Sequence, residues 1–175
     1  MPGFLAHAKD LPLDVTVRAY TDADHDVVAA VYASTREDEM KLATAWSDAQ
    51  KRDFLHGQFA LQDRHYRLHY PSAEHAVIEQ RAQPIGRLVV NAGNSEVRLM
   101  DVALLPAFRG RGVGTAILHR LLAFADGLGI PVTLHVEPFN PARRMYLREG
   151  FAFVETRGIY EFMRRPPQGQ LNTAS

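Results

Sequence analysis

The stretch LLPAFRGRGVGT, residues 104–115, decides the fold that this sequence predicts. A strand-like run ends at its start, and an amphipathic helical pattern begins inside it. The glycines and arginines of interest are Arg109, Gly110, Arg111, Gly112 and Gly114. Glycine permits positive φ angles and lets ligand atoms approach the backbone closely. The first amides of a helix lack internal acceptors and lie at the positive end of its dipole. The stretch therefore predicts a strand-to-helix turn that binds an anion, and a phosphate fits best.

Two well-known phosphate-binding motifs do not fit this stretch. A P-loop requires Lys-Ser or Lys-Thr after its last glycine, whereas Gly114 is followed by Thr115 and Ala116. A dinucleotide fingerprint GxGxxG would need a third glycine where Thr115 stands, and it would lie near the start of a βαβ unit. A plain strand-to-helix turn that binds nothing is the structural alternative.

Hydrophobic periodicity on both sides of the stretch predicts a mixed α/β domain. Strand patterns occur at 15–20, 76–78, 85–90, 97–104, 132–136, 151–154 and 158–163. Helical spacing occurs at 27–32, 47–69, 111–128 and 141–148. Along 97–104, one parity of the alternation holds Val97, Leu99, Asp101 and Ala103. The order of elements favours a mixed sheet with helices on both faces.

Length and composition indicate one globular domain without a strong overall charge. The chain has 175 residues, and domains typically run about 100–200 residues. The apolar fraction of 46% and the charged fraction of 23% exclude wholesale disorder. Twenty basic residues balance twenty acidic ones, so no global field attracts nucleic acid or anionic lipid. The absence of cysteine excludes disulfides, thiolate nucleophiles and Cys-based metal sites.

We expect three segments along the chain. Residues 1–13 form an irregular N-terminal arm, residues 14–165 form the single domain, and residues 166–175 form a disordered tail. The N-terminus does not resemble a secretory signal, and no apolar run approaches the roughly 18–20 residues of a membrane span. The expected location is therefore cytoplasmic, with neither nucleic acid nor membrane as a partner.

Two motifs, in order and about thirty residues apart, resemble the signatures of one family. Arg109-x-x-Gly112-x-Gly114 resembles the R/Q-x-x-G-x-G/A loop that binds the acyl-CoA pyrophosphate in the GNAT superfamily of N-acyltransferases. VALLP at 102–106 resembles the strand before that loop, and NPARRMYLREGF at 140–151 is similar to the second signature helix. The close match covers 97–153, and upstream only the order of elements agrees.

The resemblance implies a GNAT-like fold. That fold is a central, mostly antiparallel sheet of six to seven strands with about four helices on both faces. The strands at 97–104 and 132–136 would splay apart around the acyl-CoA. The resemblance also implies acetyl-CoA as co-substrate and direct acetyl transfer to a primary amine in a ternary complex. The absence of cysteine fits this scheme, because no acyl-cysteine intermediate can form.

The resemblance also implies which residues hold the acyl-CoA. Backbone amides of 111–115 would bind the pyrophosphate, with Arg109 beside it. Val102 and Leu104 would pair with the pantetheine arm, and one of their amides would polarise the thioester carbonyl. Asn140 would bond the pantetheine arm and also cap its helix. The implied set is Val102, Ala103, Leu104, Arg109, Gly110, Arg111, Gly112, Val113, Gly114, Thr115, Asn140, Arg143 and Tyr146.

By the same resemblance, Tyr146 is the candidate general acid for the departing CoA thiolate. The alternative is an aromatic residue that packs into the core. Asp101 and Glu137 are the candidate bases that take a proton from the incoming amine. Both carboxylates could instead be ion-pair partners of Arg98 or Arg87, and ordered water could replace a single base.

His65 and His69 lie four residues apart on the helix expected at 47–69 and share one face. HxxxH spacing can bind metal, but position 66 is a tyrosine where an HExxH motif has glutamate, so no metal is expected. We expect His65, His69 and Tyr70 to line the acceptor entrance; a solvated helix face is the alternative. The acidic run 37–39 is expected in a loop between two helices, where it could attract a cationic acceptor or be merely solvated.

Several functional questions stay open at the level of sequence. The acceptor is a small-molecule or peptide amine, and a homodimer that exchanges C-terminal strands is compatible with the pattern. A non-catalytic acyl-CoA-binding sensor or regulatory domain is the main alternative to an acetyltransferase. A nucleotide-binding enzyme of another kind is disfavoured by the missing lysine and third glycine.

Overall fold

The computed structural model describes residues 3–169 of the chain. Residues 1–2 of the expected arm and 170–175 of the expected tail lie outside the described residues. The elements, in chain order, are the 3-10 turn η1 (Phe4–Ala6), β1 (Val15–Ala19), the 3-10 turn η2 (Asp22–Asp24), α1 (His25–Ser34), α2 (Glu37–Leu42), α3 (Asp48–His69), β2 (Glu74–Gln80), β3 (Gln83–Ala92), β4 (Val97–Leu104), the 3-10 turn η3 (Pro106–Phe108), α4 (Val113–Leu128), β5 (Val132–Val136), α5 (Ala142–Arg148), β6 (Ala152–Arg157) and β7 (Tyr160–Arg165).

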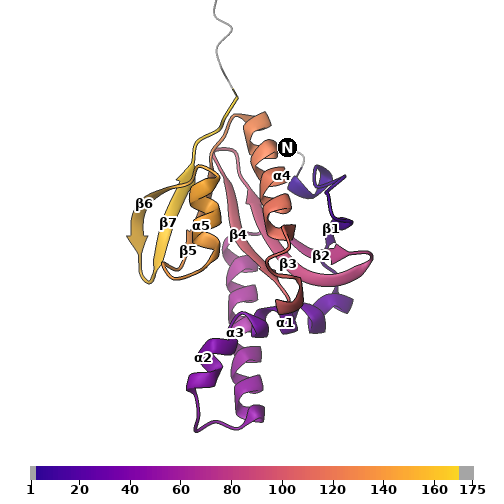
Figure 1. Cartoon of the computed structure of the whole chain (residues 1–175), viewed down its shortest axis with the longest axis vertical. Helices are drawn as coiled ribbons and strands as arrows, with labels where there is room; N and C mark the ends of the chain where they lie inside the picture. Colours follow the sequence, from indigo (N-terminus) through magenta and orange to yellow (C-terminus); the bar gives the residue numbers. More distant parts are fainter. Residues whose placement is uncertain (1–2, 170–175) are drawn as a thin grey trace, which may run out of the picture.

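The strands form one mixed sheet at the centre of the molecule (Figure 1). Their order across the sheet is β1-β2-β3-β4-β5-β7-β6. β4 and β5 run parallel, and the other neighbouring pairs run antiparallel. The predicted mixed α/β fold with a mostly antiparallel sheet of up to seven strands is confirmed.

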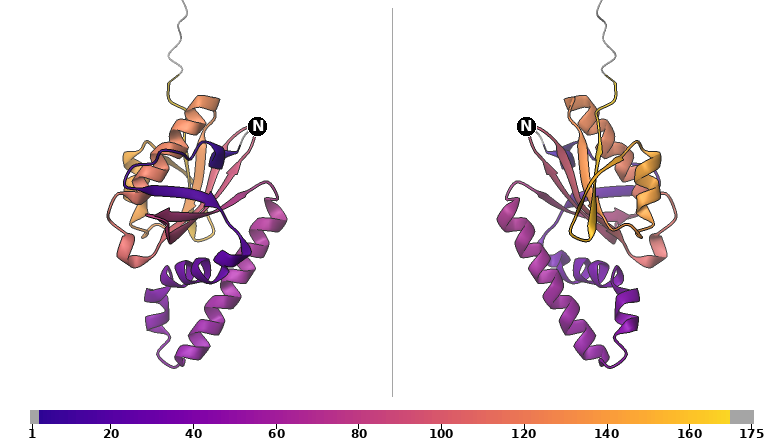
Figure 2. Two further views of the ribbon diagram at one scale, coloured as in Figure 1. Left: turned by 90° about the vertical axis from the view of Figure 1, so that its right-hand side faces the viewer. Right: turned by 90° about the vertical axis from the view of Figure 1, so that its left-hand side faces the viewer.

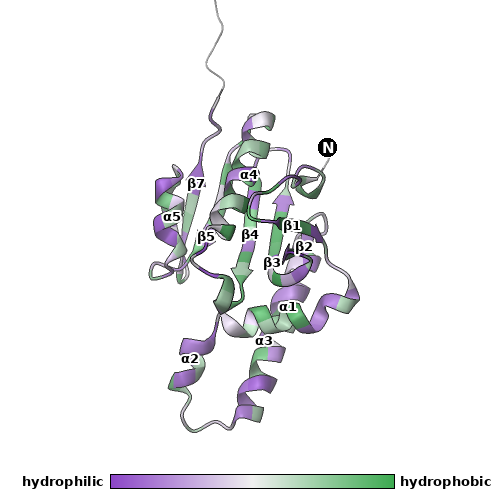
Figure 3. Ribbon diagram, turned by 45° about the vertical axis from the view of Figure 1, so that its right-hand side comes forward, coloured by the Kyte–Doolittle hydropathy of each residue, from purple (hydrophilic) through white to green (hydrophobic). Residues whose placement is uncertain are grey.

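Helices cover both faces of this sheet, as Figure 2 shows from two sides. The alternation of β2 separates two cores: Ala76 and Ile78 belong to the larger core with α4, whereas Val77 packs with α1 and α3. Figure 3 shows hydrophobic residues along the central strands and α4, and more hydrophilic ones along α2. The larger core also holds Phe4 of η1, whose ring meets Phe124 of α4 edge to face at 5.8 Å.

The helix expected at 47–69 forms as α3, and its start is set by a reciprocal cap. The Ser47 side chain accepts a hydrogen bond from the Gln50 amide, and the Gln50 side chain accepts one from the Ser47 amide. The prediction of a loop around 37–39 is wrong, because these residues begin the short helix α2. Acidic residues suit a first helical turn, and an ion pair between Asp38 and Lys41 spans one turn of it.

A β-bulge in β4 breaks the alternation expected along that strand. Leu99 is opposite Val90 and Asp101 is opposite Val89, so Met100 is the extra residue. Strict alternation would place Asp101 on the same face as Val97 and Leu99. The bulge places it on the opposite face. Val97 and Leu99 lie in the larger core on the α4 side, whereas Asp101 faces a cavity on the other side.

β4 and β5 pair over only three residues and then separate. The paired residues are Val97 with Val132, Arg98 with Thr133, and Leu99 with Leu134. β4 continues to Leu104 and β5 to Val136, but beyond Leu99 and Leu134 the two strands no longer pair with each other. The predicted splay is confirmed, and it leaves backbone groups of both strands free at the centre of the sheet.

Among the helices within residues 3–169, none is both long and apolar enough to cross a bilayer. We retain the division into arm, domain and tail as a proposal.

Candidate active site

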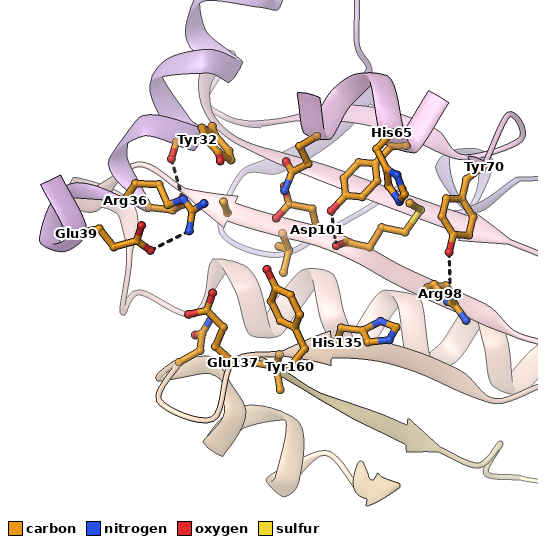
Figure 4. A pocket seen from close by; sticks show the side chains of 18 residues that line it. Tyr32, Arg36, Glu39, His65, Tyr70, Arg98, Asp101, His135, Glu137 and Tyr160 are labelled. Carbon is orange, nitrogen blue, oxygen red and sulfur yellow. Dashed lines mark hydrogen bonds and ion pairs between the residues drawn. The ribbon is translucent and has the colours of Figure 1, made fainter. Parts of the chain in front are cut away.

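A cavity of about 550 Å³ opens where β4 and β5 separate (Figure 4). α1, α2 and α3 border one side of it, and β4, β5 and β7 border the other. Its wall is unusually rich in phenols, charged groups and imidazoles. These side chains are Tyr32, Tyr66, Tyr70, Tyr160, Arg36, Arg98, Glu39, Asp101, Glu137, His65 and His135.

Asp101 lies in the middle of the cavity wall and is paired from behind. Its Oδ2 is 2.9 Å from Nε of Arg87, whose side chain is buried against the ring of Phe59. Burial raises the pKa of the Asp101 carboxyl, although the Arg87 charge and the Val102 amide act in the opposite direction. The carboxylate is therefore more basic than that of an ordinary aspartate. Asp101 thus forms the ion pair with Arg87 that was the alternative to a role as base, and it also lines the cavity.

Glu137 supplies a second carboxylate, just after the end of β5. Within residues 3–169 this carboxylate has no hydrogen-bond or ion-pair partner. It lies near Tyr160, whose pKa is raised by burial and further by the Glu137 charge. An unpaired carboxylate in a half-enclosed cavity is suited to bind an incoming ammonium group.

Tyr66 of α3 fixes the bulge of β4, and the sequence analysis missed it. Its hydroxyl donates a hydrogen bond to the Met100 carbonyl at 3.3 Å. Burial raises the pKa of Tyr66 above the ordinary value for tyrosine, so its hydroxyl stays protonated at neutral pH and can donate. The helical pattern of 47–69 includes Tyr66 among its apolar positions, but that pattern does not predict this hydrogen bond. No local pattern signals this contact, because it forms only when α3 packs against the sheet.

The expected acceptor residues fall into two groups. His65 and Tyr70 line the cavity, whereas His69 lies outside its wall. The two imidazoles are in contact but tilted by 46° to each other, with ring centroids 4.4 Å apart. No three His, Asp or Glu side chains gather into a metal-binding arrangement anywhere in the part of the chain that the structure describes.

The glycine-rich turn has the geometry of an anion site at the start of α4. Gly110 and Gly112 have φ angles of +70° and +85°, which only glycine adopts without strain. The first amide bonded into the helix is that of Ala116, which donates to the Gly112 carbonyl. A Cβ on Gly114 would meet no protein atom within 4 Å. The helix start is thus open above Gly114, and its free amides fit the phosphates of an acyl-CoA.

The side chains beside this turn point in different directions. Arg109 turns back, donating to the Leu104 carbonyl at 2.8 Å and to Ser34 Oγ at 3.1 Å. Arg111 is exposed, and Thr115 donates to the Met145 sulfur. Any charge that Arg109 adds to the turn therefore acts from the α1 side.

The second motif places its residues around α5. Asn140 lines the cavity, and its Oδ1 accepts a hydrogen bond from the Ala142 amide, which caps the helix. Tyr146 is buried, with its ring edge to face against Phe151 at 5.6 Å. Burial raises the pKa of Tyr146 to about 12, and the Asp101 charge adds to the shift. Arg143 bonds Glu161 of β7.

The structure brings some of the predicted site residues together and leaves others apart. The cavity wall holds Asp101, Glu137, Val102, Ala103, Asn140, His65 and Tyr70. Outside that wall lie Tyr146, Arg143, His69, Leu104 and the residues of the turn at 109–115. The assignments of catalytic, acyl-CoA-binding and acceptor roles stay predictions.

A family model described as the acetyltransferase (GNAT) family matches residues 23–151, which includes both motifs. Solved structures also resemble the chain. The PaiA N-acetyltransferase from Thermoplasma acidophilum, in complex with coenzyme A, has a TM-score of 0.64 at 16% identity, over 87% of this chain and 98% of that one. Ard1 from Thermoplasma volcanium has a TM-score of 0.58 at 19% identity, over 89% of this chain and 99% of that one. An acetyltransferase from Thermus thermophilus has a TM-score of 0.62 at 19% identity, over 90% of this chain and 99% of that one.

Proposed function

The chain belongs to the GNAT family of acetyltransferases, and we propose that it moves an acetyl group from acetyl-CoA to a primary amine by direct transfer in a ternary complex. The observation that carries the proposal is the position of the cavity. It opens where β4 and β5 separate, and β4 leads from it, through η3, to the open helix start at Gly112. A donor bound at the turn can therefore extend along the free edge of β4 toward Asp101, with Glu137 at the end of β5 across the opening.

The residues present fit an acyl-CoA. Free amides at the start of α4 would hold its pyrophosphate. The edge of β4 at Val102 and Leu104 does not pair with β5 and would bond its pantetheine arm, with the Leu104 carbonyl also accepting from Arg109. Asn140 borders the same opening. When bound, acetyl-CoA supplies an activated thioester and a thiolate leaving group.

Asp101 is the proposed base. Its raised pKa suits it to take a proton from the acceptor ammonium, directly or through water. The unpaired Glu137 would attract and orient that ammonium. The deprotonated nitrogen then attacks the thioester carbonyl, the carbon–sulfur bond breaks, and the nitrogen loses a second proton to water as the amide forms. Tyr146 is the proposed donor of a proton to the departing sulfur, since its phenol stays protonated at neutral pH.

A non-catalytic acyl-CoA-binding domain is the alternative function. Such a domain needs the turn at 109–115 but has no use for two carboxylates in the wall of the cavity beside it. The cavity with Asp101 and Glu137 therefore favours an enzyme. A cytoplasmic location and a homodimer stay part of the proposal.

The test combines binding and turnover. Calorimetry with acetyl-CoA should show saturable binding, and release of free CoA thiol should depend on an added primary amine. Asp101→Asn should lower kcat at least about tenfold, since general-base catalysis typically contributes more than that. Because the Asp101 pKa is raised, wild-type activity should fall as pH drops through that raised value, and Asp101→Asn should lose this limb of the profile.

Asp53→Asn, on the exposed face of α3, is the matched control and should behave like the wild type. An Asp101→Asn enzyme with the wild-type kcat and pH profile would remove Asp101 from the mechanism.

A further inference from the structure

Arg98 stands at the closed end of the cavity, where β4 and β5 still pair. Its side chain is 20% exposed and is held by two groups. Nη1 donates to the Tyr70 hydroxyl at 2.9 Å, and Nη2 donates to Glu96 at 2.7 Å. A guanidinium carries five N–H donors, so these two bonds leave it under-satisfied. Its Nε is buried and has no partner among residues 3–169.

Two arginines line the cavity, and each of them has an acidic partner. Arg36 is paired with Glu39, and both line the cavity, so their charges cancel there. Arg98 is paired with Glu96, which is not part of the cavity wall. The closed end therefore offers unused guanidinium N–H donors, which a carboxylate of a ligand can accept.

The other groups at this end suit an anion as well. Figure 4 shows Tyr70, His65 and His135 around Arg98, with Asp101 farther along the cavity. Tyr70 is fixed against Arg98, since the guanidinium also lies 5.7 Å from its ring centre. Burial, with the nearby charges of Arg98 and Arg157, lowers the pKa of His135. The Arg98 guanidinium carries its charge at any physiological pH.

The bulge at Met100 places this anion site on the same side as the proposed base. Without an extra residue, positions 98 and 101 would face opposite sides of the sheet. With it, both side chains enter one cavity. Three residues of strand span about 10 Å at most, so one small molecule can reach both Asp101 and Arg98.

We propose that the acceptor is a small amino acid, whose carboxylate binds Arg98 while its amine lies at Asp101 and Glu137. This inference rests on the proposed acetyl transfer and specifies its acceptor. The volume of about 550 Å³ fits such a molecule, since small-ligand sites typically measure about 300–1,000 Å³.

The test uses stable adducts that need no turnover. The CoA sulfur is joined through an acetyl bridge to the amine of glycine or of γ-aminobutyrate. The matched neutral adducts carry glycinamide or γ-aminobutyramide, which have the same shape without the charge. Calorimetry on the full chain then measures the dissociation constant of each adduct and of free CoA.

We expect the carboxylate adduct to bind at least tenfold more tightly than its carboxamide for at least one of the two spacers. Arg98→Gln should reduce this preference to less than threefold while leaving the affinity for free CoA unchanged. Arg81→Gln is the matched control, because Arg81 lies in the β2–β3 turn with an 82% exposed side chain, and it should keep the full preference. Arg98→Lys provides a second variant if Arg98→Gln does not fold, and it should show a reduced preference.

Equal affinities of acid and amide adducts in the wild type would overturn this proposal and leave the proposed function standing. A preference that persists in Arg98→Gln, or in Arg98→Lys at full strength, would overturn it equally. A chain that binds neither free CoA nor any adduct would overturn the proposed function, and this proposal with it.

Discussion

Burial raises the pKa of both the Asp101 carboxyl, which faces the cavity, and the Tyr146 phenol, which is packed in the core. The same physical cause has opposite uses. A carboxylate with a raised pKa is a better proton acceptor, whereas a phenol with a pKa of about 12 stays a proton donor at any physiological pH.

Tyr146→Phe tests the donor at this scale. We expect kcat to fall by about a hundredfold, the lower end of the usual effect of general acid–base catalysis. The affinity for acetyl-CoA should not change, because the ring still packs on Phe151. Because the Tyr146 pKa is about 12, its titration should not limit wild-type activity at neutral pH. Steady-state kinetics and calorimetry check both expectations.

Tyr20→Phe, on a tyrosine outside the cavity wall, serves as the control and should keep the wild-type kcat. Turnover by Tyr146→Phe at the wild-type rate would assign Tyr146 to packing alone.

Sequence reasoning found Asp101, Glu137 and Tyr146 because they lie within or next to motifs of fixed spacing. Tyr66 could not be found in that way. Its hydroxyl bonds a backbone carbonyl 34 residues away, and only the packing of α3 on the sheet creates that contact. The orientation of Arg109 toward Ser34 depends on tertiary structure in the same way.

At the scale of elements, the start of α4 can be tested without straining the backbone. Gly112 is a poor position for this, since its φ of +85° disfavours any side chain. Gly114 is helical and has open space around it, so Gly114→Asp should fold. Its negative charge should repel a pyrophosphate and raise the dissociation constant of CoA at least about tenfold, the size of one lost charge-assisted interaction.

Gly57→Asp is the matched control, because Gly57 also lies in a helix with no atom within 4 Å of its Cβ position. It should bind CoA like the wild type in the same titration. Unimpaired CoA binding by Gly114→Asp would mean that the turn does not hold the pyrophosphate.

The elements themselves were largely predictable, with two exceptions that have physical causes. α2 has six residues with a strongly acidic start, too short for apolar periodicity to reveal it. The bulge at Met100 leaves no mark in the hydrophobic pattern, yet it decides which residues of β4 enter the cavity. Periodicity gives the existence of a strand, but its register depends on the neighbouring strand.

At the scale of the whole molecule, a bidentate ion pair joins α4 to the last strand. Arg165 of β7 is buried and donates to both carboxylate oxygens of Asp126, at 2.8 and 3.1 Å. Burial alone would raise the pKa of Asp126, but the hydrogen bonds from Arg165 and the Gln168 amide outweigh it and lower the pKa. The pair also ties in α5, because Arg165 donates to the Glu149 carbonyl.

Asp126→Asn should therefore lower the free energy of unfolding by about 2 kcal/mol at pH 7, a typical cost for a hydrogen bond to a charged group. A carboxyl with a lowered folded-state pKa stabilises above its unfolded value of 3.8 and loses that contribution as pH falls through the folded value. The difference between wild type and variant should thus shrink below about pH 4. Urea unfolding at neutral and acidic pH measures it, with Asp53→Asn as the control. A difference that stays constant with pH would show that the charge of Asp126 is not responsible.

The cavity is a property of the whole molecule that local patterns could not supply. Its wall joins Tyr32 of α1 to Tyr160 of β7, which are brought together only when the helices pack across the sheet. The close motif match began at residue 97, so the N-terminal half, which forms one side of the cavity, was predicted only as an order of elements.

The short pairing of β4 with β5 has a thermodynamic consequence. Three residue pairs are all that join the half-sheet β1–β4 to the half-sheet β5–β7–β6 through the backbone within the described residues. A ligand that forms hydrogen bonds with the free edge of β4 and contacts β5 would hold the two halves of the sheet together. The free energy of unfolding then depends on ligand occupancy. It rises by about 2.7 kcal/mol when the ligand is present at a hundred times its dissociation constant. The melting temperature of this protein would then rise with the concentration of such a ligand.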